Sequence, residues 1–284
     1  MQIFSNNKMM SVKPSMAVLT LVVLMLTNCN HKQTTEIRNE YKKYYDQFNV
    51  EGSFVLYDPQ AEKYVFYNPN QYEQTFSPAS TFKICNTLIG LETGVIKDKH
   101  FVIQWDSVLR NPVWDKDHDL KTAFEHSTVW YYQELARRVG GERMKYWLDK
   151  VSYGNADTSG GIDRFWLTGG LRISPKQQIE FLKQLHNNQL PFSQRSVNIL
   201  KEIMITKDTL GYVIRAKKGW GNLGKNDVGW YVGYLEKNGN VYYFSNCVQT
   251  ESEKLNNINR AIGFDKARSA IVFKILDELK LTRK

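Results

Sequence analysis

Ser80 and Lys83 lie three residues apart in a stretch, Ser-Pro-Ala-Ser-Thr-Phe-Lys, that begins at Ser77. Ser77 is a typical N-cap and Pro78 suits the first helical position, so a helix is predicted to start here and to end near Gly94. Side chains three residues apart share one helix face, which lets the Lys83 amine reach the Ser80 hydroxyl. The pair predicts a nucleophilic serine with its own base.

The main chain at Ser80 adds a second chemical element. In the first turn of a helix the N–H groups have no partner within the helix, so the N–H of Ser80 is predicted to be free to donate to a negatively charged oxygen. A nucleophile, a base and an oxyanion donor are the parts that acyl transfer needs. The motif Ser-x-x-Lys also occurs by chance, where a serine caps a helix and the lysine lies on the surface. Other motifs must therefore decide whether Ser80 and Lys83 are catalytic.

The composition indicates a folded protein with a large core. Of 284 residues, 42% are hydrophobic and 13% aromatic, and no linker, repeat or low-complexity stretch interrupts the chain. The formal charge is +9, but basic residues alternate with acidic ones along the chain. This distribution is typical of a solvated surface that modestly favours anionic ligands, and we do not expect nucleic-acid binding.

The N-terminal residues 1–29 have the pattern of an export signal. Lys8 and Lys13 precede an apolar run, 17–26, that is too short to span a bilayer comfortably. The run ends in Leu-Thr-Asn-Cys, which resembles the lipobox of bacterial lipoproteins apart from Asn28, where a small residue is usual. Lipid attachment at Cys29 and ordinary cleavage nearby both remain open. We therefore expect a periplasmic or otherwise exported protein, free or lipid-anchored, with no membrane span after processing.

The cysteines and histidines do not indicate a metal site. Beyond the signal, Cys85 lies in a predicted apolar helix and Cys247 in a predicted strand, so both are expected to be small buried residues. Their redox state remains open. The spacing of cysteine and histidine residues matches no zinc pattern, and no metal ion is expected.

Strands are predicted near both ends of the chain, with helices between them. The strand ranges are 52–57, 63–67, 212–217, 228–235 and 241–248, and the helical ranges are 34–48, most of 80–198, and 264–281. Asn238-Gly239 is a strong hairpin signal between the last two strands. This order predicts an α/β (α+β) fold with one antiparallel sheet, flanked by terminal helices, and an all-helical lobe.

This organisation predicts one catalytic domain over residues 30–284 that contains a helical insertion at about 80–198. Ser80 begins the insertion, whereas Lys217 ends a strand of the sheet. The natural ligand site lies between the two lobes, where both residues can meet.

Five short motifs together resemble the class D, or oxacillinase-type, serine β-lactamases among the penicillin-recognising enzymes. In the family's order they are Phe76 to Lys83, Ser127-Thr128-Val129, Tyr153-Gly154-Asn155, Phe165 to Gly169, and Lys217-Lys218-Gly219. The resemblance covers nearly all of the chain beyond the signal. It implies a β-lactamase/transpeptidase-like fold and an enzyme that hydrolyses penicillin-type antibiotics and confers resistance.

The resemblance also implies how the chemistry proceeds. Ser80 attacks the lactam carbonyl to form an acyl-enzyme, and water then hydrolyses it. In the family the lysine at the position of Lys83 is N-carboxylated by CO2 and acts as the general base, and no other cofactor is expected. Val129, Trp166 and Leu167 offer apolar surface that would keep this lysine dry, and the indole N–H of Trp166 would hold the carbamate.

Further site residues follow from the second and third motifs. Ser127 resembles the serine that relays a proton to the lactam nitrogen, and Lys217 the lysine that assists it and attracts the substrate carboxylate. The family usually has threonine or serine where this chain has Lys218, so an added cation stands in place of a hydroxyl. Gly219 is expected to let substrate approach the strand, and the N–H of Trp220 to be a second oxyanion donor.

Arg268, near the start of the final predicted helix, resembles the arginine that binds the carboxylate of a β-lactam. The local match is loose, and the alternative is a solvated helix arginine. Substrate preference within the β-lactams and dimerisation also remain open.

Other functions fit parts of the sequence. A β-lactam sensor or a transpeptidase-like acceptor would be acylated at Ser80 without turnover. Sensors normally follow several membrane spans, and transpeptidases usually have asparagine where Val129 stands. An α/β-hydrolase esterase would need a Gly-x-Ser-x-Gly elbow, which is absent. A structural surface lipoprotein would not need the coordinated serines and lysines.

Overall fold

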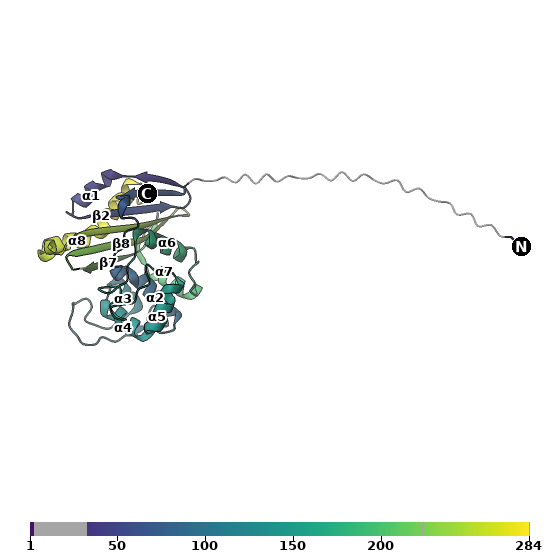
Figure 1. The fold of residues 1–284 in the computed structure, drawn as a ribbon, viewed down its shortest axis with the longest axis horizontal. Helices are drawn as coiled ribbons and strands as arrows, with labels where there is room; N and C mark the ends of the chain where they lie inside the picture. The colour runs from purple at the N-terminus through teal and green to yellow at the C-terminus, as the bar shows by residue number, and fades with distance from the viewer. Residues whose placement is uncertain (3–32, 223, 284) are drawn as a thin grey trace. The chain divides into compact units, whose positions relative to one another are not determined.

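The computed structural model describes residues 1–2, 33–222 and 224–283 (Figure 1). Residues Gln33–Lys284 form one compact unit, and the following description concerns that unit. The predicted export signal, including Cys29, lies outside the described residues. Within the described ranges, no helix is both long enough and apolar enough to cross a membrane.

A seven-stranded sheet, in the order β1-β3-β2-β9-β8-β7-β6, forms the centre of the unit. Its strands are β1 (Thr34–Ile37), β2 (Glu51–Asp58), β3 (Lys63–Tyr67), β6 (Ile205–Asp208), β7 (Val213–Asn222), β8 (Asn226–Lys237) and β9 (Asn240–Glu251). All neighbours are antiparallel except β1 and β3. The sheet therefore joins strands from both ends of the chain, as predicted.

The hairpin between β8 and β9 is also confirmed. Lys237 pairs with Asn240, and the two residues between them, Asn238 and Gly239, have φ angles of 51° and 80°. Two residues with positive φ make the turn that matches the twist of a tight hairpin.

One face of the sheet is covered by α1 (Lys42–Asp46) and α8 (Ile258–Glu278), as Figure 1 shows. Apolar side chains of α8, including Phe264, Ile271 and Ile275, pack against Ile214 of β7 and Phe244 of β9. The predicted terminal helix is confirmed and begins earlier than expected. This packing holds α8 against the strands that carry the second half of the site.

The predicted helix over 34–48 is wrong in its first part. Residues Thr34–Ile37 form β1, which pairs in parallel with β3, and α1 is reached only after a 3-10 turn at Asn39–Tyr41. The β-branched residues Thr34, Thr35 and Ile37 suit an extended chain, and the free edge of β3 supplies the hydrogen-bonding partner.

The other face of the sheet carries the helical lobe. Its helices are α2 (Lys83–Glu92), α3 (Leu120–Glu125), α4 (Val129–Val139), α5 (Gly141–Lys150), α6 (Pro175–His186) and α7 (Gln194–Ile203). The lobe is not purely helical, because β4 (Val102–Ile103) and β5 (His118–Asp119) form a small two-stranded ribbon. Further 3-10 turns lie at Pro69–Gln71, Ala79–Phe82 and Ser252–Asn256.

Helix α2 lies at the centre of the lobe. Every residue from Lys83 to Leu91 is buried, and apolar residues such as Leu88 and Ile89 pack against neighbouring helices. A helix that is buried all round has little freedom to shift. Its first residue, Lys83, is therefore held in a fixed position.

Candidate active site

Ser80 lies in a 3-10 turn, Ala79–Phe82, that leads directly into α2. The expected α-helical start with Ser77 as N-cap is wrong, because a 3-10 turn comes first, Pro78 precedes it without a side-chain cap, and α2 begins only at Lys83. The Ser77 hydroxyl donates to the carbonyl oxygen of Trp166, 2.9 Å away, and accepts from the N–H of Ala79 at 3.4 Å. Ala79 has a φ of 46°, in the left-handed region that costs energy for a residue with a Cβ. The turn is tight, and it leaves Ser80 8% exposed at the cavity wall.

Lys83 stands directly behind the serine. Its Nζ lies 2.7 Å from Ser80 Oγ, and the whole residue is buried. Burial, and then the charge of Lys217, hold the pKa of Lys83 well below its usual value. The surroundings therefore favour the neutral amine, the form that can accept a proton or react with CO2.

Trp166 is also completely buried, and its ring centroid lies 5.4 Å from that of Phe82. Its indole Nε1 has no hydrogen-bond partner among the described residues. A buried N–H without an acceptor is unfavourable, so this atom is a ready donor for an acceptor placed beside it.

Ser127 and Lys217 come together from the two lobes. Ser127 precedes α4, Lys217 lies on β7, and Lys217 Nζ donates to Ser127 Oγ at 3.1 Å. Burial, followed by the charges of Arg268 and Lys218, lowers the pKa of Lys217 to about 7. At neutral pH this lysine can therefore both give and take a proton.

Gly219 lies where β7 meets the turn that carries Ser80. A Cβ at this position would lie 3.0 Å from the carbonyl oxygen of Pro78 and 3.1 Å from Cγ2 of Thr81. The missing side chain therefore lets β7 pack closely against the turn that carries Ser80. The expected approach of substrate to this glycine stays a prediction.

The outer edge of β7 is open beyond Ala216. The N–H of Ala216 donates to Met204 O, and alternate residues of a strand direct their main-chain groups to the same edge. The N–H groups of Lys218 and Trp220 therefore point to that edge, where β6 has already ended. Trp220 and Ser80 both line the same cavity.

Arg268 of α8 is buried, and its side chain extends to Gly219 on β7. Its Nη1 donates to Gly219 O at 2.9 Å, its Nη2 pairs with Asp265, and its guanidinium lies 5.5 Å from the Trp220 ring centroid. Burial lowers the pKa of Arg268 to about 10, so it stays charged at neutral pH. The alternative of a solvated helix arginine is wrong.

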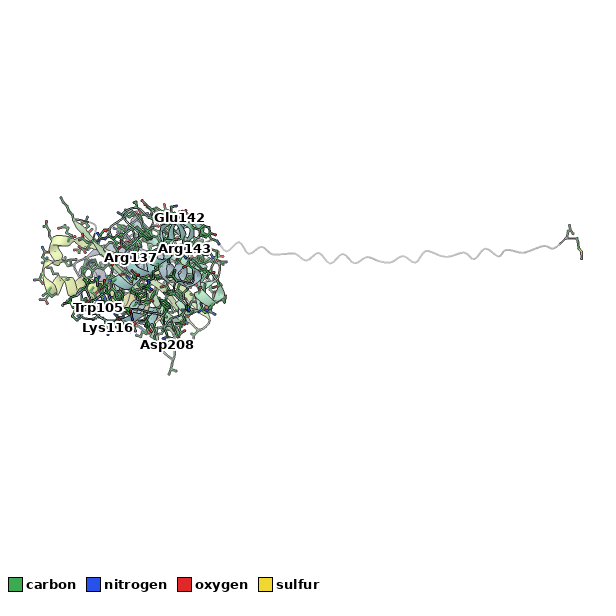
Figure 2. The ribbon with its side chains drawn as sticks, turned by 90° about the horizontal axis from the view of Figure 1, so that it is seen from below. Trp105, Lys116, Arg137, Glu142, Arg143 and Asp208 are labelled. Atoms are coloured by element: carbon green, nitrogen blue, oxygen red, sulfur yellow. The ribbon has the colours of Figure 1, made fainter. Side chains whose placement is uncertain are left out.

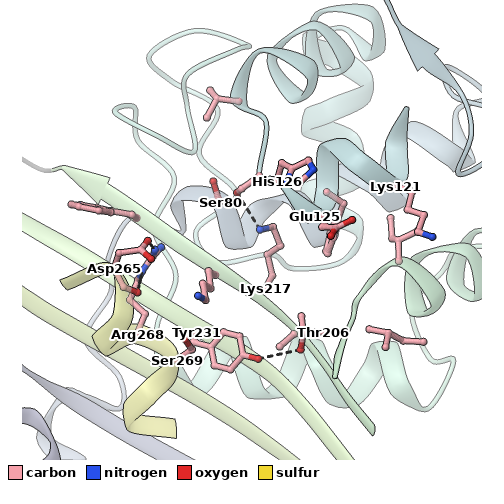
Figure 3. A pocket seen from close by; sticks show the side chains of 18 of the residues that line it. Ser80, Lys121, Glu125, His126, Thr206, Lys217, Tyr231, Asp265, Arg268 and Ser269 are labelled. Atoms are coloured by element: carbon pink, nitrogen blue, oxygen red, sulfur yellow. Dashed lines mark hydrogen bonds and ion pairs between the residues drawn. The ribbon is translucent and has the colours of Figure 1, made fainter. Parts of the chain in front are cut away.

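A cavity of about 1140 Å³ joins these groups (Figure 3). The predicted site residues in its wall are Ser80, Ser127, Val129, Lys217, Lys218, Trp220 and Arg268. The others, Lys83, Trp166, Leu167 and Gly219, are not part of this wall. Lys83 and Trp166 are fully buried, and Leu167 packs against the core of the helical lobe.

Comparisons with known proteins agree with this geometry. The family described as "Penicillin binding protein transpeptidase domain" matches residues 39–269. Beta-lactamase OXA-48 from Klebsiella pneumoniae is 42% identical over 206 residues, which cover 72% of this chain and 78% of that protein. The chain belongs to the class D β-lactamases.

Two solved structures extend the comparison. The class D β-lactamase YbXI from Nostoc has a TM-score of 0.79 and 43% identity, covering 85% of this chain and 98% of that one. The C-terminal domain of the Bacillus licheniformis BlaR penicillin-receptor has a TM-score of 0.80 and 31% identity, covering 88% and 98%. Proteins of this fold therefore include both a β-lactamase and a penicillin receptor.

Sequence reasoning missed Trp114, His126 and Asp265, which also line the cavity. The loop between β4 and β5 brings Trp114 there. The N–H of Trp105 donates to Asp117 at 2.8 Å across the base of this loop, and Figure 2 labels Trp105 and Lys116, which belong to it. No local signal marks this loop.

His126 and Asp265 could have been identified from their positions next to predicted site residues. His126 directly precedes Ser127, and the backbone carbonyl of His126 accepts a hydrogen bond from Trp114 Nε1 at 3.0 Å. Asp265 lies three residues before Arg268, on the same helix face, where an ion pair is expected.

Among the residues that the structure describes, no three His, Cys, Asp or Glu side chains are grouped to hold a metal ion. Cys85 and Cys247 are both free and buried, which confirms their predicted burial, and burial raises the pKa of each thiol.

Proposed function

We propose that this protein hydrolyses the amide bond of penicillin-type β-lactams through a covalent acyl-enzyme on Ser80. The observation that carries the proposal is the contact between Ser80 Oγ and the buried Lys83 Nζ at 2.7 Å, at the wall of a cavity that also holds Ser127 and Lys217. A nucleophile, a base and a second proton carrier thus face one space.

Acylation follows from the placement of these groups. The Ser80 oxygen attacks the lactam carbonyl while the Lys83 side chain accepts the hydroxyl proton. The N–H groups of Ser80 and Trp220 stabilise the resulting oxyanion. As the carbon–nitrogen bond breaks, Ser127 gives its proton to the lactam nitrogen and recovers one from Lys217. Water then attacks the ester carbonyl and frees Ser80 together with the ring-opened acid.

The residues around Lys83 fit an N-carboxylated lysine. The buried environment favours the neutral amine that combines with CO2, and the unpartnered Nε1 of Trp166 supplies a donor for a carbamate oxygen. The carbamate, when formed, supplies a carboxylate that serves as general base for the serine and for the deacylating water. Val129 and Leu167 add apolar surface nearby that limits solvent access.

The carboxylate of the substrate binds at the cationic end of the cavity. Arg268 and Lys217 both face this space, and Figure 3 shows Arg268 and Asp265 at one end of the pocket and Lys121 at the other. An arginine held by neighbouring groups suits a planar carboxylate. Hydrolysis outside the cytoplasm, which the N-terminal sequence favours, would confer β-lactam resistance.

The proposal is tested by hydrolysis of penicillin in bicarbonate buffer, followed by absorbance. The wild-type protein is expected to turn over many equivalents, and Ser80→Ala to release none above the buffer rate. Ser53→Ala removes a buried hydroxyl of β2 that does not line the cavity, and it should retain activity. Equal rates for wild type and Ser80→Ala would reject the proposal.

A second function is a β-lactam receptor, which the similarity to the BlaR penicillin-receptor domain favours. Such a protein would form the same ester at Ser80 and keep it. The two functions differ only in deacylation, so the lifetime of the adduct separates them.

A further inference from the structure

The adjacent lysines of β7 send their side chains to opposite faces of the sheet. Lys217 reaches Ser127 on the side of the helical lobe. Ala216 packs in the core beneath α8, and residues two apart in a strand share one face, so Lys218 lies on the same face as Ala216. Lys218 also pairs across the strands with Tyr231, which belongs to the same core. Lys218 therefore lies on the α8 side, and both lysines line one cavity because the edge of β7 is open.

Lys218 has no anionic partner among the described residues. It is half-buried, and no carboxylate lies within ion-pair distance of its Nζ in the part of the chain that the structure covers. Asp265, the acidic residue at this end, is paired with Arg268. Burial, and then the charge of Arg268, lower the pKa of Lys218. A half-buried cation beside another cation is unfavourable unless an anion joins them.

A lysine here does not simply replace the hydroxyl that the family usually has. A threonine hydroxyl sits on the β-carbon, close to the strand, whereas the ammonium group ends a long flexible stem. The positive charge of Lys218 is therefore displaced from the strand into the cavity. On the α8 side this space is also lined by Ser269 and Tyr231, which Figure 3 shows together with Arg268.

We propose that Lys218 forms a second anion subsite, next to Arg268, which takes an additional acidic group on the ring side of a β-lactam. This inference rests on the proposed function, in which the ring carboxylate binds at Arg268. In a cephalosporin the carbon beside the carboxylate-bearing carbon carries a variable substituent. An acidic group there would extend from Arg268 toward Lys218.

The charges explain why a doubly negative ligand is favoured. Arg268, Lys218 and protonated Lys217 bring three positive charges to this cavity, whereas Asp265 and one ring carboxylate bring two negative charges. Lys218 then still lacks a counter-charge. A second carboxylate supplies it in a partly desolvated position, where a charge pair contributes more than at an open surface.

The test compares two cephalosporins that share one acyl side chain and differ in whether the substituent at ring carbon 3 carries a carboxylate. Their dissociation constants are measured by calorimetry on the Ser80→Ala protein at constant ionic strength, so that turnover plays no part. The dianionic ligand is expected to bind about tenfold more tightly, as a partly buried charge pair allows. Raising the salt concentration should shrink this ratio.

Variants of Lys218 and a matched control identify the source of the preference. In the same background, Lys218→Met and Lys218→Thr should bring the ratio close to one, while Lys218→Arg should retain it. Lys121→Met removes a cation from the other end of the cavity and should leave the ratio unchanged. Equal binding of both ligands to the Lys218-containing protein, or an unchanged ratio after Lys218→Met, would overturn the subsite.

The outcomes also separate this inference from the function on which it rests. Tight binding of both cephalosporins without a preference, together with hydrolysis by the wild-type enzyme, would reject only the subsite. Failure of both ligands to bind would reject the β-lactam site itself and the subsite with it.

Discussion

Lys83 Nζ lies 2.7 Å from Ser80 Oγ, and the lysine is completely buried beneath the serine. No salt bridge joins Lys83 to a carboxylate in the described part of the chain, and burial and the charge of Lys217 both lower its pKa, which favours the neutral amine. In the proposed mechanism, the same burial that would destabilise an ordinary lysine prepares this one as a base, alone or after reaction with CO2.

Replacing this lysine should remove the base. Lys83→Ala is expected to lower kcat/KM for penicillin by roughly 100- to 10,000-fold, the usual contribution of a general base, and to slow deacylation most of all. For the wild type, activity lost in CO2-depleted buffer should return when bicarbonate is added. Wild-type activity that is indifferent to bicarbonate would contradict the carbamate assignment.

Trp166→Phe keeps an aromatic ring in the core but removes the unpartnered indole N–H. Because a hydrogen bond to a charged group contributes about 1.5 to 3 kcal/mol, the bicarbonate concentration for half-maximal activity should rise roughly 10- to 100-fold. Carbon-13 NMR with labelled bicarbonate measures carbamate formation directly. Trp147 packs on Phe192 in the helical lobe. Trp147→Phe is therefore the control and should leave the bicarbonate concentration for half-maximal activity unchanged.

Stability should rise with pH above about 7. The pKa of Lys217 is lowered to about 7 in the folded protein, and it returns to about 10.4 when the chain unfolds. Between these values the unfolded chain binds more protons, so the penalty for burying the lysine is present below pH 7 and disappears as the pH rises. Lys217→Met should reduce the slope by up to about 1.4 kcal/mol per pH unit.

Denaturant unfolding between pH 7 and 9 measures this slope. Higher pH is avoided because burial raises the pKa of Tyr41 to about 12, which gives the opposite dependence once unfolded tyrosines ionise near pH 10. The exposed Lys145 provides the control, since Lys145→Met should not change the slope. Equal slopes in wild type and Lys217→Met would show that Lys217 is not buried as a neutral amine.

Gly219→Ala should impair catalysis more than folding. The added Cβ meets Pro78 O at 3.0 Å and Thr81 Cγ2 at 3.1 Å, so β7 must move away from the turn that holds Ser80. A shift of this kind can lower kcat/KM by up to about 100-fold. Gly211→Ala, where a Cβ meets nothing within 4 Å, should keep full activity. Comparable activity in the two variants would contradict this role of Gly219.

The chemistry of this site could be predicted from the sequence because its groups are few and lie in short motifs. Ser80, Lys83, Ser127 and Lys217 were identified from residue type, spacing and family resemblance, and the structure brings them around one cavity wall. The antiparallel sheet followed from strand patterns and one strong turn. Both kinds of signal are local.

The misses depend on contacts between distant segments. Thr34–Ile37 is a strand because the edge of β3 is available. Ser77 is hydrogen-bonded to the distant Trp166 carbonyl oxygen, and a 3-10 turn stands where the first turn of an α-helix was expected. Trp114 reaches the cavity through a loop whose path no short pattern encodes. The placement of Lys218 on the α8 face needed the register of β7 against β8.

An intact-mass time course with excess penicillin in bicarbonate buffer tests the central claim most directly, with the adduct mapped by digestion. The account predicts a transient adduct on Ser80 that decays while hydrolysed penicillin accumulates over many turnovers. An adduct that persists after one equivalent would contradict the hydrolase and support the receptor function, and the absence of any adduct would contradict covalent catalysis by Ser80.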